Sequence, residues 1–160
     1  MPLIGTPDTV HVSLSSRLNL LGVLESTARV LCERLEFGAD ARDQVILAVV
    51  EAATNAIMHG HRRDPGRIVD VVFESWPDRI EITVHDGGPG FDPGAVDGDI
   101  TAEDRFLAQE GRGIFIMRTC MDVVDFRFDS SGTVCHLVKR RVGPAAGSEP
   151  VAGAGPPQPG

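Results

Sequence analysis

The chain has 160 residues, a formal net charge of −8 and 42% hydrophobic residues, which suits one domain with a core of its own. Its acidic balance argues against sequence-independent nucleic-acid binding, because that activity depends on basic patches. The sequence contains no run of about 18 apolar residues and no N-terminal secretory pattern. We therefore expect a cytoplasmic protein that binds neither nucleic acid nor membrane directly.

The cysteines are odd in number, and Cys32, Cys120 and Cys135 do not have the spacing of a metal site. Each of them falls within an apolar segment of the sequence. We interpret them as reduced residues of the core rather than as redox or metal-binding groups.

The first third of the chain predicts a short strand followed by two helices. The strand is expected at residues 10–14, where apolar and polar residues alternate weakly. Apolar residues then recur with the helical period over residues 17–35 and 41–58. The second helix is apolar around most of its surface, so Glu51 and Asn55 are conspicuous within it.

The next part of the chain predicts two β-hairpins with a loop and a helix between them. We expect strands at residues 68–76, 80–85, 123–128 and 133–141, and a helix at residues 112–121. Residues 92–110 carry many charges and show little periodicity. They predict a long loop of the kind that often forms a lid over a site.

This order of elements predicts an α+β fold, a two-layer sandwich in which helices cover one face of a mostly antiparallel sheet. The domain is expected to span residues 1–142, with a lid at about residues 92–112. Residues 143–160 are rich in Ala, Gly and Pro and bury too little apolar surface to order themselves. We expect them to form a disordered tail.

Glu51 and Asn55 are the first candidate site residues. They stand at positions i and i+4 of a predicted helix, so both side chains project from one face. A carboxylate in this place can accept a proton, and the amide oxygen of asparagine is a ligand that Mg²⁺ accepts. The pair is a candidate base beside a candidate metal ligand, although a glutamate without a catalytic role is the plain alternative.

Asp86 ends an apolar predicted strand and is followed at once by a glycine-rich turn. Gly88 and Gly90 leave the backbone of this turn open to close approach by a ligand. The plain alternatives are an aspartate that caps a turn and glycines that only shape it.

Gly111 and Gly113 flank Arg112 where the helix at residues 112–121 is predicted to begin. Free backbone N–H groups and the positive end of a helix dipole can bind phosphate there, and an arginine would assist. The plain alternative is a helix start without a ligand. Acid, amide, a slot of adenine size and a phosphate cradle together predict a nucleotide site.

Four segments of the chain resemble, in order and spacing, the motifs of the GHKL ATPase superfamily, which includes gyrase and sensor histidine kinases. Residues 51–55 resemble its N box, residues 86–90 its first glycine box, residues 111–113 its second, and residues 132–133 its terminal Gly-Thr motif. Within this superfamily the chain is most similar to bacterial anti-sigma-factor serine/threonine kinases. It is one short domain, and Glu51 stands where histidine kinases usually have a histidine.

The resemblance implies the Bergerat ATP-binding fold, with ATP and Mg²⁺ as cofactors. Glu51 would be the catalytic base, Asn55 the Mg²⁺ ligand and Asp86 the group that binds adenine. The other nucleotide contacts would come from Gly88, Gly90, Gly111, Arg112, Gly113 and Thr133, the last of which is alternatively an ordinary strand residue. Residues 108–110, Ala-Gln-Glu, lack the arginine that some of these kinases have before the second glycine box, and Arg112 or Arg105 could replace it.

The resemblance also implies a function and partners. The protein would hold a sigma factor inactive, would phosphorylate an anti-sigma-factor antagonist of the STAS type, and would form a homodimer. A second hypothesis is a non-catalytic regulator that binds ATP and a partner, with Glu51 retained for packing. A histidine-kinase domain acting in trans and an ATPase clamp of the gyrase kind fit less well, because we find no phosphoacceptor helices or long transducer domain in the sequence.

Overall fold

The computed structural model describes residues 5–60, 64–87 and 102–143, except the side chains of residues 59–60, 102–110 and 129. Residues 88–101 lie outside this part, and with them Gly88, Gly90 and residues 92–101 of the predicted lid, as do residues 144–160 of the predicted tail. Among the helices of the described ranges, none has both the length and the apolar character needed to cross a membrane.

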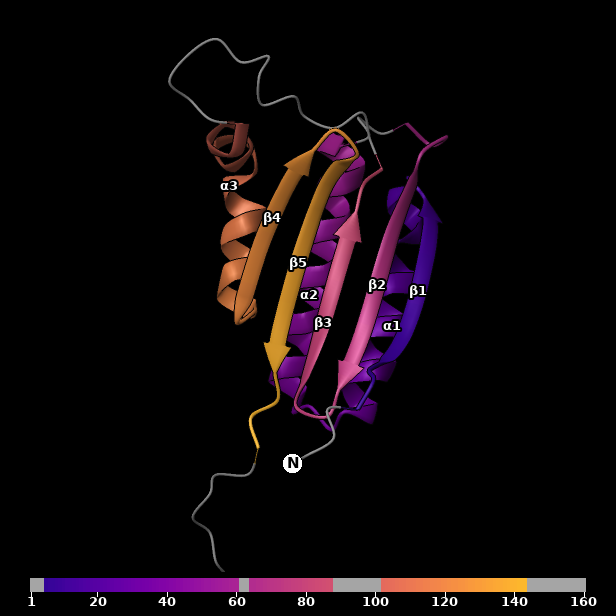
Figure 1. The fold of residues 1–160 in the computed structure, drawn as a ribbon, viewed down its shortest axis with the longest axis vertical. Helices are drawn as coiled ribbons and strands as arrows, with labels where there is room; N and C mark the ends of the chain where they lie inside the picture. Colours follow the sequence, from indigo (N-terminus) through magenta and orange to yellow (C-terminus); the bar gives the residue numbers. More distant parts are fainter. Residues whose placement is uncertain (1–4, 61–63, 88–101, 144–160) are drawn as a thin grey trace, which may run out of the picture.

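One antiparallel sheet organises the described part of the chain (Figure 1). Its strands lie in the order β1-β2-β3-β5-β4, so the hairpins β2–β3 and β4–β5 join through β3 and β5. The strands are β1 (Asp8–Ser15), β2 (Ile68–Trp76), β3 (Arg79–His85), β4 (Val123–Asp129) and β5 (Gly132–Arg140). The central strand β3 therefore ends close to the start of its neighbour β5.

The helices lie on one face of the sheet and leave the other face open (Figure 1). They are the short 3-10 helix η1 (Leu18–Leu20), α1 (Leu21–Arg34), α2 (Ala39–Asn55) and α3 (Ala102–Cys120). Helix α2 contacts α1, α3 and the strands β3 and β5. It continues directly into a π-helical turn, η2 (Ala56–Gly60), a local geometry that often accompanies functional sites.

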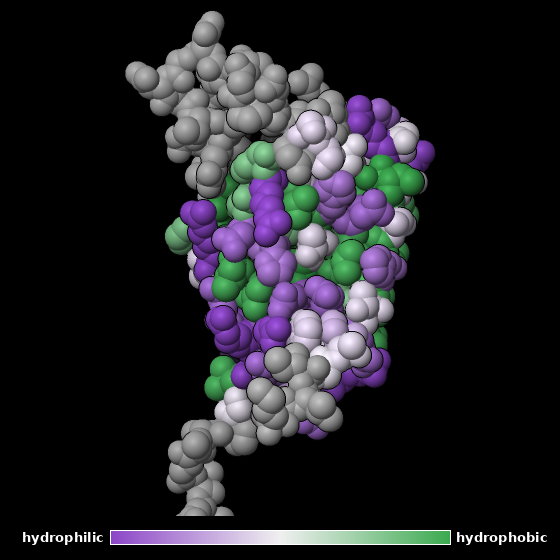
Figure 2. All heavy atoms as spheres, viewed as in Figure 1, coloured by the Kyte–Doolittle hydropathy of each residue, from purple (hydrophilic) through white to green (hydrophobic). Residues whose placement is uncertain are grey.

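The core lies between the sheet and the helices, because alternate residues of each strand point to opposite faces. In β3, Ile80, Ile82 and Val84 are buried, whereas Arg79 and Glu81 are partly exposed. Figure 2 shows the open face of the sheet as a mixture of hydrophilic and hydrophobic side chains. The apolar layer that holds the fold together is therefore on the helical side.

The structure confirms the predicted two-layer α+β sandwich, and the hairpin strands lie close to their predicted bounds. The three cysteines, Cys32, Cys120 and Cys135, are buried and free, as predicted. The expected first helix is divided between η1 and α1, and the rest of the N-terminal order is as expected.

The prediction of a loop as far as residue 110 is wrong, because α3 already begins at Ala102. Residues 102–110 contain no Gly or Pro and include Ala, Leu, Glu, Gln and Arg, all of which favour helix. The high density of charge in this segment concealed its helix propensity. As a result, Gly111 and Gly113 lie inside α3 rather than at its N-terminal end.

Candidate functional site

The carboxylate of Glu51 and the carboxamide of Asn55 lie where α2 meets α3. Gly113 of α3 lies against both side chains: a Cβ atom added there would stand 3.1 Å from Glu51 Oε2 and 3.4 Å from Asn55 Oδ1. Contacts this short leave room for a hydrogen atom and little more. The predicted common face of Glu51 and Asn55 is therefore confirmed, and Gly113 is brought against both side chains.

Asn55 is 8% exposed, and its side-chain Nδ2 atom has no hydrogen-bond partner. It is one of three such buried side-chain atoms in the described residues, the others being Ser75 Oγ and Trp76 Nε1. Buried polar groups are normally paired, since an unpaired group loses its hydration without compensation. Asn55 also lines a cavity, so the missing partner is best explained by a polar atom of a ligand.

Asp86 follows β3 directly and is 5% exposed. Its Oδ1 accepts a hydrogen bond of 2.8 Å from the backbone N–H of Thr133. The N–H of Asp86 donates in return to the carbonyl of Thr133, at 3.1 Å. These two hydrogen bonds fix the Asp86 carboxylate at the point where β3 ends and β5 begins.

A cavity of about 20 Å³ lies between α2 and the sheet at this point. Its lining residues are Ala52, Asn55, Ala56, Val84, Asp86, Phe126, Thr133 and Cys135. That volume holds about one water molecule, so the slot has to widen before it can accept a nucleotide base. Ala52 and Ala56 contribute small side chains to the wall, and Phe126 contributes an aromatic ring.

Five wall residues were not predicted as site residues: Ala52, Ala56, Val84, Phe126 and Cys135. Val84 and Cys135 lie on the same faces of their strands as Asp86 and Thr133, so the period of two along a strand would have indicated them. Phe126 reaches the cavity because it is the register partner of Cys135 across β4 and β5. That pairing could not be read from the sequence.

The thiol of Cys135 contributes an apolar part of the wall. Burial raises its pKa to about 12, and the nearby negative charge of Asp125 acts in the same direction. The group therefore remains a neutral thiol at ordinary pH.

The expected phosphate cradle does not have the predicted geometry. Gly111, Arg112 and Gly113 occupy interior positions of α3, and inside an α-helix each N–H group bonds to the carbonyl four residues earlier. A free helix N-terminus at Gly111 is therefore absent from the described structure, because the helix-favouring segment before it extends α3. The Arg112 side chain is exposed, while Gly113 faces Glu51 and Asn55.

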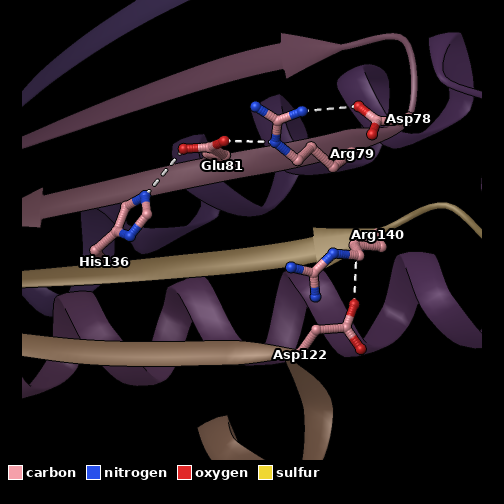
Figure 3. A network of polar contacts seen from close by, with 6 residues as sticks. All are labelled: Asp78, Arg79, Glu81, Asp122, His136 and Arg140. Atoms are coloured by element: carbon pink, nitrogen blue, oxygen red, sulfur yellow. Dashed lines mark hydrogen bonds and ion pairs between the residues drawn. The ribbon is translucent and has the colours of Figure 1, made fainter.

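A second polar cluster lies on the open face of the sheet (Figure 3). Arg79 contacts Asp78 at 2.9 Å and Glu81 at 2.6 Å, and the other oxygen of Glu81 lies 3.2 Å from His136 Nε2. Burial alone would raise the pKa of the Glu81 carboxyl, but hydrogen bonds from Arg79 and His136 hold it below its usual range. The sheet separates this cluster from the cavity, because Glu81 lies on the opposite face of β3 from the buried Val84.

The described residues fit Mg²⁺ bound together with a nucleotide, and not a metal held by protein alone. They contain no group of three or more His, Cys, Asp or Glu side chains arranged to hold a metal ion. Mg²⁺ commonly takes one or two protein oxygens together with phosphates and water. The Oδ1 atom of Asn55 could be such a protein oxygen, and the unpaired Nδ2 of the same side chain could donate a hydrogen bond to a phosphate oxygen.

Comparisons with known proteins agree with this geometry. Residues 14–139 match a family model described as the histidine kinase-like ATPase domain. The protein named serine-protein kinase RsbW of Halalkalibacterium halodurans is 31% identical over 143 residues, with 85% of each chain covered. The protein of the same name from Bacillus cereus is 26% identical over 132 residues, which cover 79% of this chain and 82% of that protein.

The fold also matches a solved structure, that of the RsbU and RsbW domains of Rv1364c from Mycobacterium tuberculosis. The TM-score is 0.58 at 15% sequence identity, and the match covers 84% of this chain and 32% of the other. At this level of identity the likeness establishes the fold alone.

Proposed function

Because the chain belongs to the histidine kinase-like ATPase family, we propose that it is an ATP-dependent protein serine/threonine kinase of the anti-sigma-factor type. The observation that carries the proposal is the Glu51–Asn55 pair, which lies beside a cavity whose wall includes the clamped carboxylate of Asp86. Relatives named serine-protein kinase, similar over most of their length, support the same activity.

One group of residues would bind the adenine of the nucleotide and another would bind its phosphates. Asp86 would accept a hydrogen bond from the exocyclic amine of adenine, with Thr133 beside it. Gly88 and Gly90 would allow the backbone to approach the nucleotide, and Gly111, Arg112 and Gly113 would serve the phosphates. Asn55 would bind Mg²⁺, which neutralises phosphate charge when it is bound together with ATP.

Glu51 would act as the general base for transfer to a protein hydroxyl. As the serine or threonine oxygen bonds to the γ-phosphorus, the bond from that phosphorus to the β–γ bridging oxygen breaks, and the hydroxyl proton passes to Glu51. The carboxylate is partly buried on the face of α2 that carries Asn55. It therefore lies one helical turn from the group that would position the phosphates.

The partners proposed for this activity are proteins. We propose a STAS-type antagonist as the phosphate acceptor, a sigma factor as the protein held inactive, a homodimer as the assembly and the cytoplasm as the location. A kinase whose acceptor is a protein needs Glu51 to be reachable from solvent, which its partial exposure allows.

A non-catalytic nucleotide-gated regulator is the second candidate. It is favoured by the departure at residues 108–110, which lack an arginine, and by the exposed position of Arg112. In such a protein the exchange of partners would follow nucleotide binding alone, without phosphoryl transfer.

The experiment is transfer of labelled γ-phosphate from Mg-ATP to STAS-domain proteins of the same genome. We expect labelling of one serine or threonine, reduced at least about 100-fold by Glu51→Gln because a carboxamide cannot accept the proton. Glu25→Gln, an exposed substitution on α1, is the control and should label like the wild type.

Two results would change the assignment. Labelling by Glu51→Gln at the wild-type rate would remove Glu51 from the chemistry. Binding of Mg-ATP without labelling of any of these proteins would favour the nucleotide-gated regulator.

A further inference from the structure

The backbone N–H groups at Gly111, Arg112 and Gly113 have two competing uses. In α3 as described, they lie inside the helix and bond to carbonyl groups of the preceding turn. The proposed function requires the same N–H groups to bind phosphate oxygens. One donor cannot fully satisfy both, so an intact α3 and a bound nucleotide exclude one another at this segment.

The backbone of α3 at Gly113 lies next to the side chains of Glu51 and Asn55. A Cβ atom added at Gly113 would stand 3.1 Å from Glu51 Oε2 and 3.4 Å from Asn55 Oδ1. These side chains are the proposed base and the proposed Mg²⁺ ligand. The neighbouring cavity, at about 20 Å³, is also too small for a nucleotide base.

The two glycines weaken α3 at this place, since glycine is less favourable than alanine inside a helix. Packing explains the presence of glycine at position 113 but not at position 111. Glu51 and Asn55 lie against Gly113, so a larger residue would not fit there without a shift. A Cβ atom at position 111 would have no atom within 4 Å. The glycine at position 111 therefore lowers helix stability without any gain in packing.

The part of α3 after the glycines is firmly held. Ile114, Met117 and Cys120 are buried in the core. The Nζ atom of Lys139 donates a 2.7 Å hydrogen bond to the Cys120 carbonyl and a 2.8 Å hydrogen bond to Gln44 Oε1. Any opening of the helix is therefore expected to stop close to Gly113.

We infer that the N-terminal half of α3 and the nucleotide compete for the N–H groups of residues 111–113, so that helix stability sets nucleotide affinity. The inference rests on the proposed function and assigns a regulatory element to the same site. Nucleotide selects chains in which α3 has opened as far as Gly113. By linkage, a partner that stabilises the intact helix lowers nucleotide affinity, and nucleotide lowers the affinity for that partner by the same factor.

Three substitutions in α3 test this competition by calorimetric titration with Mg-ATP. Gly111→Ala strengthens the helix and should weaken binding about fivefold. Ala108→Gly weakens the helix and should tighten binding by up to about fivefold. Thr119→Ala also favours helix, but it lies in the exposed last turn that stays folded, so it should bind like the wild type.

The outcomes separate the inference from the proposed function. A wild-type chain that binds no Mg-ATP overturns the proposed function and this inference with it. If the wild type binds and Ala108→Gly does not bind more tightly, the competition is refuted while the nucleotide site stands. In that case, weaker binding by Gly111→Ala alone would show that position 111 matters only in the bound state.

Discussion

The two polar clusters of this chain lie on opposite faces of one sheet and differ in how their groups are paired. On the open face, the charges of Asp78, Arg79 and Glu81 meet opposite charges at 2.9 Å and 2.6 Å. On the helical face, Asn55 is more deeply buried and has an unpaired side-chain nitrogen. The ion pairs of the open face contribute to stability, whereas the unpaired nitrogen of Asn55, a residue that also lines a cavity, indicates a place for a ligand.

The comparison predicts that substitutions on the helical face change activity and those on the open face change stability. After Glu51→Gln, the largest effect on phosphate transfer is expected for Gly113→Ala. The added methyl group would stand 3.1 Å from Glu51 Oε2, and the carboxylate, at the end of a flexible side chain, would move instead of the backbone. We expect phosphate transfer at saturating Mg-ATP to fall at least about tenfold, because catalysis tolerates little misplacement.

Gly22→Ala, in helix α1 and outside the site, is the matched control for that substitution. Its methyl group meets no atom within 4 Å, so at saturating Mg-ATP this variant should transfer phosphate at the wild-type rate. Equal maximal rates for both alanine variants would contradict the positioning of Glu51 by α3.

The next effect concerns the open face and depends on pH. Glu81→Gln should lower the free energy of unfolding by about 1 kcal/mol near neutral pH, because the variant loses charge-assisted hydrogen bonds. The pKa of Glu81 lies below its ordinary value of 4.5, so the stabilisation is present above that value and is lost as pH falls through the lowered pKa. Urea unfolding of the wild type and of Glu81→Gln at about pH 7 and at about pH 3 measures the difference in stability with the carboxylate ionised and with it protonated. A difference of the same size at both pH values would show that the ion pairs do not cause it.

The fold was predictable where a periodic pattern coincided with burial. The alternation in β3, with Ile80, Ile82 and Val84 buried, fixed the strand and its inner face. The pair Glu51 and Asn55 was found because positions i and i+4 share a helix face. Such local spacing can be read from the sequence without knowledge of the tertiary structure.

What the sequence did not indicate depends on contacts between distant segments. The pairing of Phe126 with Cys135 follows from strand register, and the contact of Gly113 with Glu51 follows from the crossing of α3 and α2. The early start of α3 at Ala102 was missed for a different reason. The charges in residues 102–110 suggest a loop, whereas the helix propensity of these residue types favours the helix that forms.

The smallest effect is expected outside both clusters, at the end of α1. Glu36 has a φ of 57°, the positive-φ conformation that glycine adopts most easily, and the Phe37 N–H closes the helix end on the Cys32 carbonyl. Glu36→Gly should raise the free energy of unfolding by about 0.5 kcal/mol. The loss of the exposed contact with Arg141 at 3.5 Å costs little. Urea unfolding that shows a less stable variant would mean that this contact matters more than the backbone conformation.

The most direct measurement is calorimetric titration of Mg-ATP into the wild type, Asp86→Asn and Glu81→Gln. These variants each replace one carboxylate with a carboxamide, the first in the cavity and the second on the open face. The account predicts that the wild type and Glu81→Gln bind equally well and that Asp86→Asn binds at least about tenfold more weakly. Unchanged binding by Asp86→Asn, or an equal loss in both variants, would contradict the assignment of the cavity as the nucleotide site.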